Sequence, residues 1–370
     1  MEQPEIHKGL VGIYADTTAV SKINKETNSL LYRGYAVQDL CEKSNFEEVA
    51  HLLLFGELPT ADELKKFQEM ERANRKLSPK LIEVLKSFPK TCHPMGALRT
   101  VVSYMGLEDE DAWTHDPQGL KEKAVHIMGA LPSVVAAITR FRKGQDLIEP
   151  RDDLGFCENF FHMCFGEVPD EKIIKAFDVS MILYAEHTLN ASTFTSRVIV
   201  SSLSDIYSAV VGAIGSLKGP LHGGANEEVM HMLTDVGEPE KAKDWMLGKI
   251  ERKEKIMGFG HRVYKNGDSR VPTMTKSYHD VAALCDGAKW VEISKILEET
   301  MIAEKGIYPN LDFPAGPTYY LMGFDIPIFT PIFVMSRITG WSAHIIEQLQ
   351  DNRLIRPSSV YNGHEQRDVK

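Results

Sequence analysis

Three short segments of the sequence each place one titratable side chain among glycine, proline and asparagine residues. GPLHGGANE contains His222, GFGHRVY contains His261, and YPNLDFPAGP contains Asp312. Glycine beside a histidine allows a ligand to approach the backbone closely. The prolines predict that Asp312 lies in a fixed loop rather than on a solvated helix face. Taken singly, each residue is more often structural, as a hydrogen-bonded loop histidine or an Asx-turn aspartate.

Taken together, two histidines and a carboxylate form an acid–base set without a nucleophile. The sequence has no Gly-x-Ser-x-Gly elbow and no obvious catalytic cysteine. Such a set suits the removal of a weakly acidic C–H proton next to a carbonyl. The carboxylate takes the proton, and neutral donors stabilise the enolate oxygen as it forms.

Arginines near these segments predict that the substrate is an anion. Arg270, Arg337 and Arg356 could each hold a carboxylate by paired hydrogen bonds. Three arginines and a histidine would suit a dicarboxylate, although each arginine taken alone is equally well explained by a surface ion pair. Arg262, in the same basic stretch, has no role that the sequence assigns.

Composition excludes several classes of protein. The formal net charge of −10 argues against broad nucleic-acid binding, which needs a basic surface. No apolar run is expected to approach the roughly 18 residues of a membrane span, and the N-terminus lacks signal-peptide character. Cys157, His162 and Cys164 lack CxxC spacing, so buried helix cysteines are favoured over a metal site. The scattered cysteines indicate reduced thiols in a cytoplasm, namely Cys41, Cys92, Cys157, Cys164 and Cys285.

Helical patterns dominate the chain, and the fold class predicted is all-α. DIYSAVVGAIGSLKGP predicts a helix that ends near Lys218, and a second helix is predicted to begin with Asn226 as its N-cap and to close at Gly237. A third is predicted to open at Thr330-Pro331. TAVSKI and SLLYRGY, on either side of NKETN, indicate a hairpin. The third helix carries one apolar stripe, formed by Val334, Ile338, Trp341, Ile345 and Leu349.

The stretch from Leu221 to about Leu321 is enclosed by loops rich in glycine, proline and asparagine. We therefore expect a small domain of residues 221–321 inserted in a large domain of residues 1–220 and 322–370. His222 and Asp312 would then lie near the joins between the two domains, where clefts tend to form.

Several long motifs, in one order along nearly the whole chain, resemble the citrate synthase family. The resemblance implies an all-α fold with a large and a small domain that close over a cleft, assembled as a homodimer. Within the family, IHKGLVGIYADTTAVSKIN, TNSLLYRGY and FDIPIFTPIF most resemble the 2-methylcitrate branch. One departure is Gly96 in HPMGALR, where the family would have Asp. The motifs are LYAEHTLNASTFTSRV, GPLHGGANE, KIMGFGHRVYKNGDSR, YPNLDFPAGP, FTPIFVMSRITGW and NRLIRPSS, with RGY and HPM near the N-terminus.

The resemblance implies a catalytic role for each residue of the acid–base set. His222 matches the histidine that donates to the acyl-CoA thioester oxygen, and Asp312 matches the base that abstracts the α-proton. His261 matches the histidine that protonates the oxaloacetate carbonyl oxygen. A helix N-terminus near Asn226 would help to keep His222 neutral.

The resemblance also implies the binding residues. His187, Arg270 and Arg337 match oxaloacetate-binding positions, Arg72 matches a further substrate contact, and Arg356 matches an arginine that reaches the neighbouring subunit's site. The segment expected to line coenzyme A consists of Lys255, Ile256, Met257, Gly258 and Phe259, with Lys265 near the phosphates.

The predicted function is therefore the condensation of oxaloacetate with propionyl-CoA or acetyl-CoA, followed by hydrolysis that releases CoA. The leading hypothesis is 2-methylcitrate synthesis with citrate side activity, and a dedicated citrate synthase is the alternative. No metal, redox cofactor, nucleic acid or membrane is expected, and the cytoplasm is the expected location. Two other hypotheses are a CoA-binding protein without chemistry and a metal-dependent hydrolase. The metal-dependent hydrolase would use His187, His222, His261 and Asp312 as its metal ligands.

Overall fold

The computed structural model describes residues 5–24, 26–264 and 267–369. Within them, sixteen α-helices and three short β-strands form the fold, so the predicted all-α class is confirmed. The helices are α1 (Val37–Lys43), α2 (Phe46–Phe55), α3 (Ala61–Ala73), α4 (Pro79–Ser87), α5 (Pro94–Glu108), α6 (Pro117–Arg142), α7 (Phe156–Phe165), α8 (Glu171–Tyr184), α9 (Ala191–Val200), α10 (Ile206–Leu217), α11 (Ala225–Val236), α12 (Pro239–Glu251), α13 (Val271–Leu284), α14 (Ala288–Lys305), α15 (Asp312–Leu321) and α16 (Phe329–Gln350).

The predicted hairpin is confirmed. β1 (Ser21–Asn24) pairs antiparallel with β2 (Ser29–Tyr32), and β2 pairs with β3 (Tyr35–Ala36). The register places Ser21 opposite Tyr32. Tyr32 is fully buried, and its hydroxyl lies 2.9 Å from the carbonyl oxygen of Glu186. The hairpin is therefore attached to the turn that follows α8.

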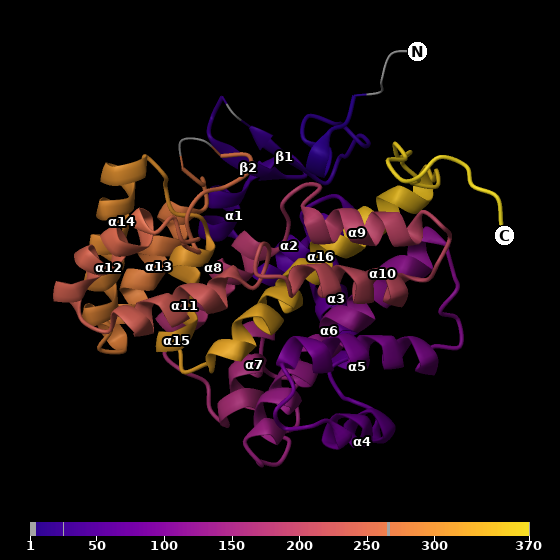
Figure 1. The fold of residues 1–370 in the computed structure, drawn as a ribbon. Helices are drawn as coiled ribbons and strands as arrows, with labels where there is room; N and C mark the ends of the chain where they lie inside the picture. The colour runs from indigo at the N-terminus through magenta and orange to yellow at the C-terminus, as the bar shows by residue number, and fades with distance from the viewer. Residues whose placement is uncertain (1–4, 25, 265–266, 370) are drawn as a thin grey trace.

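The central helix α16 begins at Phe329, one residue before the predicted opening. The predicted stripe is buried apart from Leu349, which is half-buried. The helix is not buried on that stripe alone, because residues 329–346 are buried on all sides. Figure 1 shows the reason, since α16 runs through the middle of the molecule. It packs against α2, α6, α8, α9 and α10.

Helix α11 ends at Gly237 as predicted, but its start differs from the prediction. The N-cap residue is Gly224, and Asn226 lies inside the first turn with 0% of its surface exposed. A Cβ on Gly316 of α15 would lie 2.6 Å from the backbone oxygen of Asn226. The close packing of α11 on α15 thus places Asn226 at a helix contact instead of at the cap.

Helix α6 corrects one prediction from composition. It is long and apolar enough to cross a membrane, contrary to the expectation that no run approaches this length. The apolar window is 83% buried inside the protein, however, as expected for the core helix of a globular fold. Gly129 allows this helix to approach α3 closely, because a Cβ there would lie 2.6 Å from the backbone oxygen of Glu71.

Helices α11–α15 gather at one side of the molecule in Figure 1, and they correspond to the predicted small domain. Within this group α12 packs on α14, and α11 and α13 pack on α15. Helix α13 also packs on α8, which belongs to the predicted large domain. The division at residues 221 and 321 therefore stays a prediction. Gly96, on α5, has open space around its Cβ position, so packing does not require glycine there.

Candidate active site

The segments that carry His261 and Asp312 lie side by side. Phe259 and Pro309 form an isolated antiparallel bridge, which joins residues far apart in the sequence. Asp312 is the first residue of α15, so the prediction that it lies in a loop was wrong. Pro314 and Pro317 of this segment lie within α15 itself, and the carboxylate is placed by a helix start that packs against the rest of the protein.

Asp312 is held in a polar contact that the sequence motifs did not predict. The hydroxyl of Tyr184, at the end of α8, donates to Asp312 Oδ1 at 2.7 Å. Burial raises the pKa of Asp312 to about 6, while the Tyr184 hydrogen bond and the charges of Arg270 and Arg337 act in the opposite direction. A carboxylate with such a pKa is ionised at neutral pH and is a stronger base than an aspartate in water.

His261 has one defined tautomer. Its Nδ1 accepts hydrogen bonds from the backbone N–H groups of Val263 at 3.1 Å and Tyr264 at 3.4 Å. The ring proton of the neutral imidazole is therefore on Nε2. Burial, together with the positive charge of Arg270, lowers the pKa of His261 to about 4. At neutral pH this side chain is an uncharged N–H donor.

His187 lies against His261, with 4.9 Å between the ring centroids. Burial and the nearby charge of Arg270 hold the pKa of His187 well below its usual range. Its Nε2 is buried and has no hydrogen-bond partner among the described residues. An unpaired polar atom in a buried position is costly unless a ligand satisfies it.

His222 lies in the turn before α11 and is also neutral. Its Nε2 accepts the backbone N–H of Ser192 at 3.2 Å, so the ring proton is on Nδ1. Burial first, and then the charge of Arg337, lower the pKa of His222 to about 3. The expected neutral state is confirmed, but burial is its main cause, ahead of any helix N-terminus.

Arg270 is bound to an aspartate that the sequence analysis overlooked. Its Nε and Nη2 donate to the two carboxylate oxygens of Asp268 at 3.0 and 2.7 Å. Asp268 also accepts the backbone N–H of Leu311 at 3.2 Å, directly before Asp312. Burial opposes ionisation, yet Asp268 raises the pKa of Arg270 above its usual range. Asp268 thus connects the predicted substrate arginine, Arg270, to the segment that carries the predicted base, Asp312. In the sequence, the position of Asp268 two residues before Arg270 in GDSR is the feature that could have indicated this pairing.

Arg337 lies on α16 with 2% of its surface exposed. Its Nε donates to the carbonyl oxygen of Tyr184 at 2.5 Å, and its guanidinium lies 4.6 Å from the ring centroid of Phe333. Burial lowers the pKa of Arg337 to about 10, so the group stays charged at neutral pH. Its charge acts on His187, His222 and Asp312 together.

The segment expected to line coenzyme A precedes His261 and packs beside Asp312. Phe259 lies 4.6 Å from the ring of Phe313, the residue after Asp312. Gly258 has φ +82°, and a Cβ there would lie 2.5 Å from the side chain of Val229. Ile256 and Met257 are half-buried and Lys255 is exposed, whereas Lys265 lies outside the described residues.

Two of the predicted binding residues, Arg72 and Arg356, have no contact with the histidines of the site among the described residues. Arg72 lies at the end of α3, where its charge acts on Glu47 and Glu71. No contact among the described residues connects Arg72 to the three histidines. Arg356 is exposed in the C-terminal segment beyond α16, and no contact among the described residues connects it to the three histidines either.

The ligand set of the metal-dependent hydrolase hypothesis is not assembled. Across residues 5–24, 26–264 and 267–369, no three His, Cys, Asp or Glu side chains are grouped as metal ligands would be. Cys157 and Cys164 are buried in α7, and burial raises the pKa of both thiols. They are core residues, as the sequence favoured.

The Asp268–Arg270 pair predicts a large stability effect. Asp268→Ala should lower the free energy of unfolding by about 3–5 kcal/mol, because it leaves the Arg270 guanidinium buried without its partner. Asp153→Ala is the matched control, since Asp153 and Arg151 are also two residues apart but are exposed. Urea unfolding at pH 7 measures both. An equal, small change in the two variants would contradict the assignment.

The sequence of this chain is similar to those of known proteins along nearly its whole length. A sequence model of the family "Citrate synthase, C-terminal domain" matches residues 9–358. A 2-methylcitrate synthase of Mycobacterium tuberculosis is 56% identical over 366 residues, covering 99% of this chain and 93% of that protein. A citrate synthase of Mycolicibacterium smegmatis is 54% identical, covering 100% of this chain and 98% of that protein.

Solved structures agree with the sequence relatives. A citrate synthase of the archaeon Thermoplasma acidophilum, in a ternary complex with carboxymethyl coenzyme A and oxaloacetate, superimposes with a TM-score of 0.94 at 32% identity, covering 99% of this chain and 98% of that one. The citrate synthase of Thermotoga maritima has a TM-score of 0.90 at 37% identity, with the same coverage of the two chains. This chain belongs to the citrate synthase family.

Proposed function

We propose that this protein condenses an acyl-CoA with oxaloacetate and hydrolyses the product to release CoA, which makes it an acyltransferase that converts the acyl group to an alkyl group on transfer. The observation that carries the proposal is the buried Asp312, with a pKa of about 6, on which Arg270 and Arg337 act together. One or both of the same two charges also act on each of the neutral histidines, His187, His222 and His261. This environment suits a base that must remove a weakly acidic C–H proton.

In the first step Asp312 takes the α-proton of the thioester. His222 donates its Nδ1–H to the thioester oxygen, on which negative charge develops. Because burial keeps His222 uncharged, it acts as a hydrogen-bond donor without giving up its proton. Tyr184 holds the Asp312 carboxylate by its hydrogen bond at 2.7 Å.

In the second step the enolate carbon attacks the carbonyl carbon of oxaloacetate. His261 gives its Nε2 proton to the carbonyl oxygen as the new C–C bond forms, and the proton that Asp312 took in the first step balances this loss, so that the ring returns to neutral imidazole and the carboxyl to carboxylate. Arg270 and Arg337 hold the two carboxylates of oxaloacetate, and His187 donates a further hydrogen bond from its unpaired Nε2. Hydrolysis of the thioester product then releases CoA.

The proposal also includes coenzyme A binding, closure of the small domain and formation of a homodimer. Residues 255–259, with Lys265, would line coenzyme A, and closure of the small domain over the cleft would exclude water. A homodimer would bring Arg356 of one subunit to the other subunit's site, which agrees with its exposed position in its own chain. Arg72 would be a further substrate contact. No metal or redox cofactor is required, and the location is the cytoplasm.

Propionyl-CoA is the leading acyl substrate, so the leading product is 2-methylcitrate with citrate as a side product. A relative named 2-methylcitrate synthase is 56% identical, and one named citrate synthase is 54% identical. A dedicated citrate synthase is therefore the second candidate. A hydrophobic pocket discriminates one methylene by only about 1–3 kcal/mol.

Free-thiol release tests the proposal directly. The protein is mixed with oxaloacetate and either acetyl-CoA or propionyl-CoA, and the thiol is followed with a chromogenic disulfide. Thiol release that depends on oxaloacetate is the expected result. A higher kcat/KM for propionyl-CoA would identify the 2-methylcitrate enzyme, and the reverse order would identify a citrate synthase. No release with either thioester would refute the reaction.

Asp312→Asn should reduce kcat by about 10²–10⁴-fold, because the amide cannot accept the α-proton. Oxaloacetate binding, measured by calorimetry, should change little, since the arginines and His187 are intact. Asp178→Asn is the control, as it alters another buried carboxylate at a position away from the site. A near-normal rate in Asp312→Asn would show that another group is the base.

Tyr184→Phe should move the acid limb of the rate to higher pH. Asp312 must be ionised to act, so the rate falls as the pH drops through about 6. The Tyr184 hydrogen bond lowers this pKa, and its loss raises it. Tyr207→Phe removes a comparable bond to Asp109, at 2.9 Å and away from the site, and should leave the profile unchanged. An acid limb that stays in place in Tyr184→Phe would contradict this coupling.

A further inference from the structure

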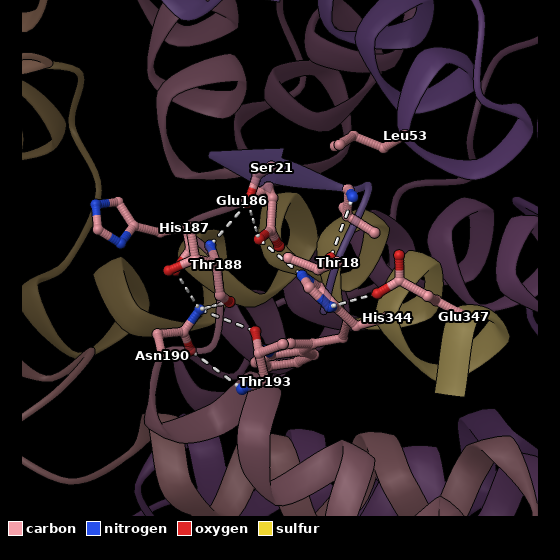
Figure 2. Close-up of polar contacts among 12 residues, drawn as sticks. Thr18, Ser21, Leu53, Glu186, His187, Thr188, Asn190, Thr193, His344 and Glu347 are labelled. Atoms are coloured by element: carbon pink, nitrogen blue, oxygen red, sulfur yellow. Dashed lines mark hydrogen bonds and ion pairs between the residues drawn. The ribbon is translucent and has the colours of Figure 1, made fainter. Parts of the chain in front are cut away.

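The turn that carries His187 has a strained backbone. Thr188, the next residue, has φ +51°. This left-handed conformation is unfavourable for a β-branched side chain, and it persists where surrounding contacts hold it. Figure 2 shows the result of the turn, because the His187 ring points away from the polar contacts behind it.

The hydroxyl of Ser21 makes hydrogen bonds to both chain neighbours of His187. Ser21, the first residue of β1, donates from Oγ to Glu186 Oε1 at 2.8 Å. The same Oγ accepts the backbone N–H of Thr188 at 3.0 Å. The residues before and after His187 are therefore tied to one atom of the hairpin, more than 160 positions earlier in the chain.

Glu186 is held from α16 as well, with 0% of its surface exposed. Its Oε1 lies 2.9 Å from His344 Nε2. Arg197 Nη1 lies 3.3 Å from His344 Nδ1, and a guanidinium only donates, so Nδ1 accepts and Nε2 donates to Glu186. A Cβ on Gly340 would lie 2.3 Å from Glu186 Oε2, so the carboxylate packs directly against the backbone of α16, where only glycine leaves space for it.

Within the described part of the chain, no hydrogen bond to another residue holds the His187 ring in a comparable way. Its Nε2 is buried and unpaired among the described residues, and its neighbours are the rings of His261 and Tyr264, at 4.9 and 5.6 Å. The direction of the ring is thus set by the backbone of the turn. Whatever fixes that backbone fixes the position at which Nε2 meets a ligand.

We propose that Ser21, Glu186 and His344 form a clamp that positions His187 for oxaloacetate. Ser21 and Glu186 are positioning residues in this assignment, because they act through His187 and do not touch the substrate. The clamp raises affinity by holding the turn in its strained form before the ligand arrives, so that binding does not have to order it. The inference rests on the proposed function, in which His187 binds oxaloacetate.

The test removes the Ser21 hydroxyl. Ser21→Ala should raise the Kd for oxaloacetate, measured by calorimetry, about tenfold, which is the effect of losing one or two positioning hydrogen bonds. The KM for the acyl-CoA should stay within about twofold, because the clamp acts on the other substrate's side. Ser21→Thr keeps the hydroxyl and should restore binding. All measurements use a temperature at which near-ultraviolet circular dichroism shows every variant folded.

Ser133→Ala is the matched control. Ser133 is also buried and donates to a backbone carbonyl, that of Arg75 at 2.6 Å, but no contact within the described part of the chain connects it to His187. This variant should bind oxaloacetate like the wild type. Any of three results would overturn the clamp. They are an unchanged oxaloacetate Kd in Ser21→Ala, a Kd raised in Ser133→Ala as much as in Ser21→Ala, and an acyl-CoA KM of Ser21→Ala that rises as much as its oxaloacetate Kd. Because oxaloacetate binding is measured without turnover, a wild type that binds it but releases no thiol would refute the proposed reaction alone.

Discussion

The burial of the Asp312 carboxylate is the constraint on which the rest of the site depends. A carboxylate removed from water is costly unless hydrogen bonds and opposite charges compensate. Here Tyr184 gives the hydrogen bond, and Arg270 and Arg337 give the positive charge, yet burial still dominates and raises the pKa to about 6. The hydrogen bond and the two charges thus compensate only in part for the burial of Asp312. The carboxylate is therefore a stronger base than an aspartate in water.

The same burial applies to the arginines that compensate for it, and each has a partner of its own. Asp268 holds Arg270 through two hydrogen bonds, and the carbonyl of Tyr184 holds Arg337. These partners leave part of each guanidinium for a ligand while fixing its plane. Burial first, and these positive charges second, keep the three histidines neutral, because a second cation nearby disfavours imidazolium. Base, donors and anion-binding groups are thus parts of one electrostatic arrangement.

The fold brings this arrangement together through a few long-range contacts. Helix α16 carries Arg337, Gly340 and His344 through the centre of the molecule, so one buried helix reaches the site and the clamp behind His187. The hairpin supplies Ser21 from the N-terminal part of the chain. The bridge between Phe259 and Pro309 sets His261 beside α15.

The sequence by itself determined the helical class, the hairpin, the end of α11 at Gly237 and the residue types of the acid–base set, because these follow from local periodicity, turn residues and motif chemistry. Tertiary structure decided that Asp312 starts a helix, that Asn226 is packed against Gly316 and is not a cap, and that Arg72 lies beside Glu47 and Glu71. It also decided the roles of Tyr184 and Glu186, whose partners lie more than 120 residues away. Local patterns describe how a segment folds, whereas the pKa of a buried group depends on neighbours that only the packed chain brings into contact.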